Sequence, residues 1–184
     1  TVGQSRDQAE EEYEDGLISI CDACDRDGDG FESETCDGTD CDDSDEYTHP
    51  GAAENDSAVD CMTDADEDGW GDNEPGDGVT AGTDCDDTDD FTFPGAAEFD
   101  SSTDCMTDAD EDGYGNDAPV DGVTAGTDCD DSDASFNPTA AEVPYDGLDQ
   151  DCDGADLTDV DGDGFDWDGV GGEDCDDEDA AINP

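Results

Sequence analysis

The sequence has almost no positive charge. It contains no lysine, two arginines (Arg6 and Arg26) and one histidine (His49) among 184 residues, against 63 aspartates and glutamates. Because a formal net charge of −61 is repelled by phosphate, nucleic acids are excluded as direct partners, as are anionic membrane surfaces. Divalent cations, or a partner bridged by them, are the natural counterparts of such a chain.

Large apolar side chains are also scarce. Leu, Ile, Val and Phe together number only 20, and the longest apolar run, 17–20, is far too short to span a membrane. Such a composition excludes a conventional hydrophobic core and is typical of an acidic disordered segment. Ten cysteines, 23 glycines and a strict repeat are features that a solvating tail does not need. We therefore expect an ordered fold when metal is bound and disorder without it.

Cysteine is the residue type that can replace a core. Ten cysteines in a small chain point to an oxidising compartment and a disulfide framework, so we expect an extracellular or cell-surface protein. Zinc is the competing explanation, but most cysteines are single rather than in CxxC pairs, and His49 is the only histidine. The chain begins at Thr1 without a signal-like segment, so a secreted precursor is expected to have been processed already.

The chain consists of four similar units. An Asp-Cys-Asp-Asp-x-Asp cluster recurs around Cys41, Cys85, Cys129 and Cys175, with steps of 44, 44 and 46 residues. A proline follows each cluster cysteine by nine residues, and an alternating-Asp loop that ends in Asp-Gly-aromatic precedes each cluster. Self-similarity at a fixed period is the signature of a tandem repeat. We divide the chain into a half-repeat, 1–22, and the repeat units 23–60, 61–104, 105–151 and 152–184.

The alternating-Asp loops resemble the first half of a calcium loop. In one of them Asp108, Asp110 and Asp112 can turn toward one centre, and Gly113 allows the reversal that brings the Tyr114 carbonyl inward. No loop has the position-12 glutamate that completes an EF-hand. The candidate loop ligands are Asp25, Asp27, Asp29 and Phe31; Asp64, Asp66, Asp68 and Trp70; Asp108, Asp110, Asp112 and Tyr114; and Asp159, Asp161, Asp163 and Phe165.

The carboxylate clusters are the nearest groups able to close each shell. They hold more carboxylates than one ion needs, so we expect multiple calcium ions, two per unit, that share bridging carboxylates. Magnesium would need only one or two carboxylates and its own waters. The cluster ligands are Asp40, Asp42, Asp43 and Asp45; Asp84, Asp86, Asp87 and Asp89; Asp128, Asp130, Asp131 and Asp133; and Asp174, Asp176, Asp177 and Asp179. Further candidates are Glu54, Glu98 and Glu142, as caps, and Asp149, Asp151 and Asp153.

Three consecutive motifs carry a family resemblance: Asp-Cys-Asp-Asp-x-Asp, then Pro-Gly-Ala-x-Glu, then Asp-Gly-x-Asp-x-Asp-Cys-Asp-Gly. Together they resemble the metal-binding repeat of secreted bacterial proteins named after MopE, best in 128–154 and 174–184 and over nearly the whole chain. The loops are also similar to thrombospondin type 3 repeats, which wrap calcium with disulfides and almost no core. The family name refers to copper, which favours imidazole and sulfur, yet His49, Met62 and Met106 are the only such candidates besides cysteine.

The resemblance and the spacing differ over the disulfides. The family pattern has a second cysteine soon after Pro-Gly-Ala-x-Glu, but Asp56, Asp100 and Tyr145 stand near its place here. Each cluster cysteine is instead followed about twenty residues later by one more cysteine, in a loop worth about 3 kcal/mol when bridged. Spacing therefore suggests the pairs Cys41–Cys61, Cys85–Cys105 and Cys129–Cys152, with Cys24–Cys36 paired locally, although sequence does not settle connectivity.

The expected fold is mostly irregular with small β elements. Glycine, proline and aspartate are too frequent for long helices or strands, and Val79 and Val123 are the candidates for a short strand or hairpin tip. The loop aromatics are expected to make apolar contacts that support the sites. The chain is therefore predicted to form an elongated, solenoid-like rod stabilised by calcium and disulfides, with almost no hydrophobic core.

The two ends of the sequence suggest self-assembly. The chain stops at 174–184, the first half of a repeat, and residues 9–22 align with the second half, 141–153. Cys21 and Cys175 are the cysteines left over, so a head-to-tail polymer would complete the repeat at each junction through an inter-subunit disulfide. The alternatives are an excerpt of a longer array, or that Cys21 and Cys175 bond within one chain or stay free.

Three functional classes fit these features. The first is a calcium-rigidified extracellular rod or fibre subunit, the second a monomeric calcium-buffering module, and the third a stalk segment of a larger secreted adhesin. An enzyme is not expected, because no histidine–nucleophile pair exists and a chain without a core has few ways to shape a cleft. Glycans remain an open partner, since Asn55-Asp-Ser57 is a sequon whose match can also arise by chance.

Overall fold

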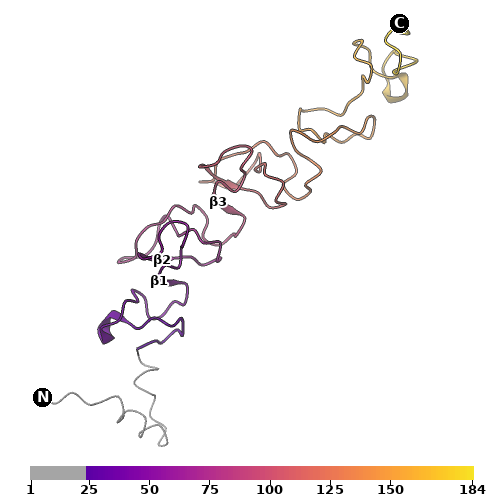
Figure 1. The fold of residues 1–184 in the computed structure, drawn as a ribbon. Coiled ribbons are helices and arrows are strands. Elements are labelled where there is room, and N and C mark those ends of the chain that lie inside the picture. Colours follow the sequence, from indigo (N-terminus) through magenta and orange to yellow (C-terminus); the bar gives the residue numbers. More distant parts are fainter. Residues whose placement is uncertain (1–23) are drawn as a thin grey trace, which may run out of the picture. The chain divides into compact units, whose positions relative to one another are not determined.

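The structure is a computed structural model that describes residues 24–184 (Figure 1). The half-repeat 1–22 and Cys21 lie outside the described residues. By its internal contacts the chain divides into two compact units, one ending at Pro94 and one running from Gly95 to Pro184. Each unit contains two alternating-Asp loops and two carboxylate clusters.

Regular structure is confined to three-residue elements. In the first unit, β1 (Thr48–Pro50) pairs antiparallel with β2 (Cys61–Thr63), so that His49 lies opposite Met62. The strands β3 (Thr92–Pro94) and β4 (Cys105–Thr107) occupy the same places in the next repeat, and the 3-10 turns η3 (Glu34–Cys36) and η4 (Asp168–Val170) follow the outer loops. Within residues 24–184, no helix is long and apolar enough to cross a bilayer.

Val79 and Val123 were predicted to form a short strand or a hairpin tip, and the strand alternative was wrong. Both valines follow a glycine with positive φ, Gly78 at +101° and Gly122 at +108°, and lie in turns. The backbone pairing near these turns is limited to single parallel bridges, Asp72 with Asp84 and Asn116 with Asp128. The strands form instead where a Thr-x-Pro segment meets the segment that carries the second cysteine of a repeat.

The apolar core consists of two small, equivalent contacts. Among residues 24–184 the buried apolar side chains are Ala53, Met62, Ala97 and Met106. Gly71 packs so tightly against the first pair that a Cβ there would lie 2.9 Å from the Ala53 Cβ, and Gly115 is in the same position against the second pair. Two methionines and two alanines cannot offset the conformational entropy of a chain this long, so other interactions must hold the fold.

Disulfides supply part of that stabilisation. The structure joins Cys24 to Cys36, Cys41 to Cys61 and Cys129 to Cys152, the same pairs that the spacing suggests. Cys85 and Cys105 are disulfide-bonded as well. Such a framework is typical of small domains that mature in an oxidising compartment.

Half-buried carboxylates provide further cross-links where the family pattern has cysteine. Asp56 Oδ2 accepts hydrogen bonds from the backbone N–H groups of Gly71 (3.0 Å) and Thr83 (2.9 Å), and its Oδ1 accepts one from the Thr83 hydroxyl. Asp100 binds Gly115 and Thr127 in the same way. Three hydrogen bonds to one charged group therefore tie each Ala-Ala-Glu segment to the loop and connector that follow it.

Candidate metal centres

Each alternating-Asp loop is folded by its own carboxylates. We number the sites 1 to 4 and place the loops 25–31, 64–70, 108–114 and 159–165 in them, in that order. The aspartate at loop position 5 accepts a hydrogen bond from the backbone N–H at position 7 in every loop, at 2.7 Å in Asp68 and 2.8 Å in Asp112. The glycine at position 6 has a φ of +90° to +94° in all four loops, which a residue with a Cβ rarely adopts.

The carboxylate cluster that follows each loop is bound to it at two points. The residue at loop position 9 forms a parallel β-bridge with the first aspartate of the cluster, as between Asp72 and Asp84. The backbone N–H at loop position 2 donates to the fourth cluster residue, as from Ala65 to Asp87 at 2.9 Å. The same hydrogen bond recurs at 2.9 Å in sites 1 and 3 and at 3.1 Å in site 4. Sites 1 to 4 are therefore completed by the clusters 40–45, 84–89, 128–133 and 174–179.

In each site, loop and cluster aspartates contribute buried carboxylate oxygens that have no hydrogen-bond partner. Within residues 24–184, all such side-chain oxygens except Asp156 Oδ1 belong to the four sites. They are Asp27, Asp29 and Asp40 Oδ2 in site 1; Asp64 Oδ1 and Asp66, Asp68 and Asp84 Oδ2 in site 2; Asp110 and Asp128 Oδ2 in site 3; and Asp161 and Asp174 Oδ2 and Asp177 Oδ1 in site 4. An unpaired buried carboxylate oxygen is costly unless a cation neutralises it.

Two sets of close oxygens meet in site 2. One carboxylate oxygen from each of Asp64, Asp66 and Asp68 lies within 4.8 Å of the others, and the same holds for Asp66, Asp84 and Asp87. Asp66 is common to both sets, so loop and cluster share a bridging carboxylate. The first cluster aspartate is the most deeply placed member, since Asp84, Asp128 and Asp174 have no exposed surface.

Burial, and after it the charge of neighbouring carboxylates, raises the pKa of several carboxyls in sites 2 and 3. Burial raises the pKa of Asp84 to about 7, and the charges of Asp68, Asp66 and Asp87 add to the effect against a backbone hydrogen bond that lowers it. The pKa of Asp68 is raised to about 7 in the same way. In site 3, burial and neighbouring aspartates raise the pKa of Asp128 to about 6. A bound cation reverses this repulsion, because it favours the ionised form of every carboxylate around it.

The residue before each repeat proline covers the loop of its own site. In site 1 the ring of His49 stacks on Phe31, with centroids 4.7 Å apart, and in site 2 Phe93 stacks on Trp70 at 6.5 Å. In sites 3 and 4 this place is taken by asparagine. Asn137 donates its side-chain amide to Asp112 Oδ2 at 2.8 Å, and Asn183 donates to Asp163 Oδ2 at 2.7 Å. We call these four residues the lid residues.

Some predicted ligands are engaged elsewhere. Asp45 accepts hydrogen bonds from the Tyr47 N–H and the Thr48 hydroxyl, and Asp89 accepts the equivalent pair, so both act as turn caps. Glu142, predicted to cap a site, instead accepts backbone N–H groups from Gln150, Asp151 and Leu157. Asp42, Asp86 and Asp130 each accept a hydrogen bond from the hydroxyl of the serine or threonine two residues later.

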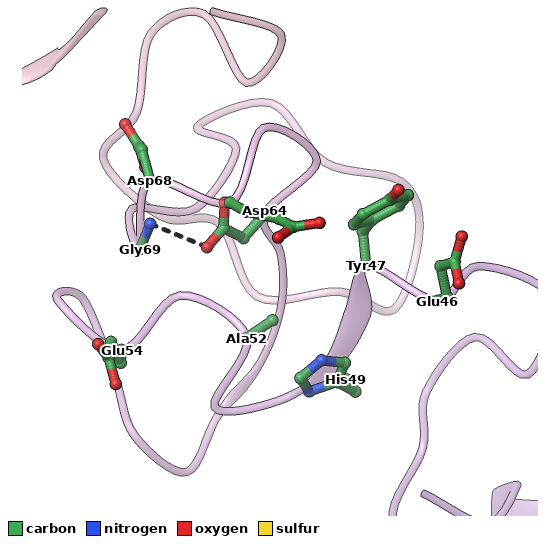
Figure 2. A pocket seen from close by; sticks show the side chains of 9 residues that line it. Glu46, Tyr47, His49, Ala52, Glu54, Asp64, Asp68 and Gly69 are labelled. Atoms are coloured by element: carbon green, nitrogen blue, oxygen red, sulfur yellow. Dashed lines mark hydrogen bonds between the residues drawn. The ribbon is translucent and has the colours of Figure 1, made fainter. Parts of the chain in front are cut away.

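Glu54 lines an acidic cavity beside site 2 (Figure 2). The cavity has a volume of about 410 Å³ and is bounded by Asp64 and Asp68 on one side and by Tyr47 and His49 on another. Asp64 Oδ2 accepts the Gly69 N–H at 3.0 Å at its wall. Glu54 is exposed at the wall of this cavity, and its role as a cap stays a prediction.

The acidic group at 149–153 folds as a loop of the same kind without a cluster of its own. Asp149 Oδ2 accepts the Gly154 N–H at 2.8 Å, as Asp108 Oδ2 accepts that of Gly113 at 2.9 Å. Its cysteine, Cys152, is bonded to Cys129 of the site 3 cluster. No carboxylate oxygen of Asp149, Asp151 or Asp153 is among the buried unpaired ones. This group therefore has the loop hydrogen bonds of a site but not its buried ring of oxygens.

Sequence reasoning missed three kinds of residue. The lid residues were passed over because they differ between repeats, although their constant place before the proline was a usable signal. Position 9 was passed over as well; there Asp72 adds a charge beside Asp87, whereas Asn116 donates its amide toward Asp131. Tyr145, noted only as a departure from the family, donates its hydroxyl to Asp177 and packs against Trp167.

The fold and the sites define a class of protein: an acidic, disulfide-stabilised tandem repeat with metal-binding constellations of carboxylates. The family model Cu-binding MopE, described as a "putative metal-binding motif", matches residues 40–68, 84–112, 128–156 and 174–184. These segments cover more than half of the chain, which belongs to this family. No curated protein and no solved structure matches the chain.

Proposed function

We propose that this chain is an extracellular calcium-binding structural repeat protein. The observation that carries the proposal is the fourfold recurrence of buried, unpaired carboxylate oxygens contributed by a loop and the cluster behind it. Without cations these oxygens repel one another in a chain that has only four buried apolar side chains within residues 24–184. Cation binding then supplies the free energy that a hydrophobic core supplies elsewhere.

The donor atoms favour calcium over the other metals. The site oxygens come from carboxylates on a flexible loop and a turn, in the number that calcium takes and magnesium does not need. Few of copper's preferred sulfur donors are available, because Met62 and Met106 are buried in the apolar contacts and eight cysteines are in disulfides, which leaves Cys175 within residues 24–184. The two oxygen sets that share Asp66 support a pair of ions per unit.

A structural role, as a subunit of a fibre or surface rod, fits better than catalysis or buffering. The sites repeat along the chain as a structural array would, and disulfides would add nothing to a simple calcium buffer. Cys175 is free and exposed, whereas Cys41, Cys85 and Cys129 at the equivalent places are all disulfide-bonded. An exposed thiol at that place supports a covalent junction with a second copy, while a monomeric module or an adhesin stalk is the alternative.

The test compares the full chain in calcium and in excess chelator. We expect several calcium ions per chain by native mass spectrometry, and on chelation a larger hydrodynamic radius and loss of the circular dichroism signal of the folded state. An unchanged radius and spectrum in metal-free protein, verified by elemental analysis, would refute calcium-dependent folding. Electron microscopy of the calcium sample distinguishes the fibre subunit from the monomeric module. Fibres that disappear in Cys175→Ser would support the fibre subunit, and a monodisperse monomer would support the module.

A further inference from the structure

The lid residues divide the four sites into two kinds. In sites 1 and 2 an aromatic ring, His49 or Phe93, stacks on the residue at loop position 7. In sites 3 and 4 an asparagine donates a hydrogen bond to the carboxylate at loop position 5. The lid residue contacts its loop in both kinds of site, so the sites differ in whether the lid side chain can donate a hydrogen bond.

The position-5 carboxylate is held differently as a result. In site 3, Asp112 Oδ1 accepts the Tyr114 N–H and Oδ2 accepts the Asn137 amide, so hydrogen bonds hold both ends of the carboxylate. In site 2, Asp68 Oδ1 accepts the Trp70 N–H, but Oδ2 is buried without a partner. Asp163 in site 4 follows the first pattern and Asp29 in site 1 the second.

Given the calcium-binding function proposed above, we propose that Asn137 and Asn183 are positioning residues that fix the position-5 ligand. Sites 3 and 4 then hold that carboxylate ready for a cation, while sites 1 and 2 leave it free to turn. The inference rests on the proposed function, but it concerns how two of the sites differ from the other two rather than whether they bind metal.

Two opposing effects of the amide have to be weighed. A hydrogen bond to Asp112 Oδ2 withdraws some charge from an oxygen that faces the cation, which weakens the attraction. However, an oxygen has a second lone pair left for the metal, and a carboxylate held at both ends does not need to reorganise on binding. Loss of such an outer partner typically costs about 10- to 100-fold in metal affinity, so positioning outweighs charge withdrawal.

The experiment needs a reporter for each site. Terbium takes the same oxygen ligands as calcium and luminesces when a nearby tryptophan is excited. Trp167→Phe leaves Trp70 as the tryptophan of site 2, and this variant is the site 2 reporter. Adding Trp70→Phe and Tyr114→Trp moves the single tryptophan to loop position 7 of site 3, which makes the site 3 reporter. The two full-length proteins then report their sites with the same residue in the same loop position.

The decisive change is Asn137→Ser in the site 3 reporter. Serine can still accept the Thr139 N–H but is too short to reach Asp112, so the contact with the ligand is lost, together with the longer amide contact to the Ala134 carbonyl at 3.3 Å. We expect chelator to remove terbium from site 3 about 10- to 100-fold faster than in the parent. Asn73→Ser in the site 2 reporter is the matched control, since Asn73 is exposed and its neighbouring contact to Asp84 uses the backbone.

The converse change is Phe93→Asn in the site 2 reporter. The new amide would donate to Asp68 Oδ2, so we expect terbium to leave site 2 more slowly than in the parent. Misfolding could only speed the loss of terbium, so slower loss would be specific to the new hydrogen bond. Rates in Asn137→Ser equal to the parent, together with no slowing in Phe93→Asn, would overturn the positioning role while leaving metal binding intact. If neither parent reporter binds terbium, the proposed calcium-binding function is refuted, and the positioning role is refuted with it.

Discussion

Sites 2 and 3 come from almost the same sequence yet carry different charge. Their loops read Asp-Ala-Asp-Glu-Asp-Gly followed by an aromatic, and both connectors contain Asp-Gly-Val-Thr-Ala-Gly-Thr. The β-bridge, the hydrogen bond from loop position 7 to the position-5 carboxylate and the aspartate cross-link to the connector are the same in both. Among the positions that differ are loop position 9, where Asp72 corresponds to Asn116, and the lid, where Phe93 corresponds to Asn137.

Both differences make site 2 more crowded with unrelieved negative charge. Site 2 has four buried carboxylate oxygens without a hydrogen-bond partner, whereas site 3 has two. Burial first and neighbouring aspartates second raise the pKa of Asp68 and Asp84 to about 7, against about 6 for the pKa of Asp128. The repeated residues therefore set the geometry of a site, and the variable positions set how much repulsion a cation has to relieve.

Removing the deepest carboxylate of each site should have the largest effect. Asp128→Asn leaves site 3 without its most buried charge, and we expect calcium affinity there to fall at least about 100-fold, more than for loss of an outer partner. Asp84→Asn should lower calcium affinity less at site 2. The charge of Asp72 remains there, and the substitution relieves more repulsion among the other carboxylates. Calcium titrations of the two reporters measure both losses. Asp77→Asn and Asp121→Asn, which remove exposed connector charges, serve as controls, and an equal loss in all four variants would contradict the assignment.

The pH dependence should separate the two sites next. A carboxyl whose pKa is raised by burial above its ordinary value of 3.8 keeps a proton in the metal-free fold that the unfolded chain has released. The metal-free fold is therefore stabilised as pH falls through the raised pKa and loses that stability as pH rises. Metal binding needs the ionised form, so affinity should fall below about pH 7 at site 2, from the pKa of Asp84, and below about pH 6 at site 3, from that of Asp128.

Calcium titrations of the two reporters at stepped pH would check this order. Coincident midpoints, or a midpoint for site 3 above that for site 2, would show that the lid and position 9 do not control proton competition. Sodium chloride should be held constant across the series, because salt screens the repulsion that raises these pKa values.

Exchanging loop position 9 should have the smallest effect. Asp72→Asn removes a charge beside Asp87, and Asn116→Asp adds one beside Asp131. We expect calcium affinity to fall at site 2 and to rise at site 3 by about 2- to 5-fold, the size of a partly exposed charge interaction. Each protein acts as the control for the other, and changes of the same sign would indicate a packing effect instead of charge.

Much of the architecture was readable from the sequence because it depends on local features. The periodic cysteines and Asp-x-Asp-x-Asp-Gly loops predicted an irregular, disulfide-bonded repeat and the family. The absence of glutamate at position 12 indicated that the cluster closes the site, and the structure brings loop and cluster together. The backbone partners of Glu142, the N–H groups of Gln150, Asp151 and Leu157, could not be read from the local pattern, and its role as a cap stays a prediction.

By itself, the sequence determined which groups can bind metal: carboxylates at alternate positions beside a glycine face one centre wherever that loop forms. Tertiary structure decided which of them meet. The family segments run from one cluster to the next loop, as in 40–68, whereas each site pairs a loop with the cluster after it. The β-bridge, the disulfides and the lid bring loop and cluster together only in the folded chain. The fold therefore decides which carboxylate oxygens are buried and unpaired and which are satisfied by water or a backbone N–H.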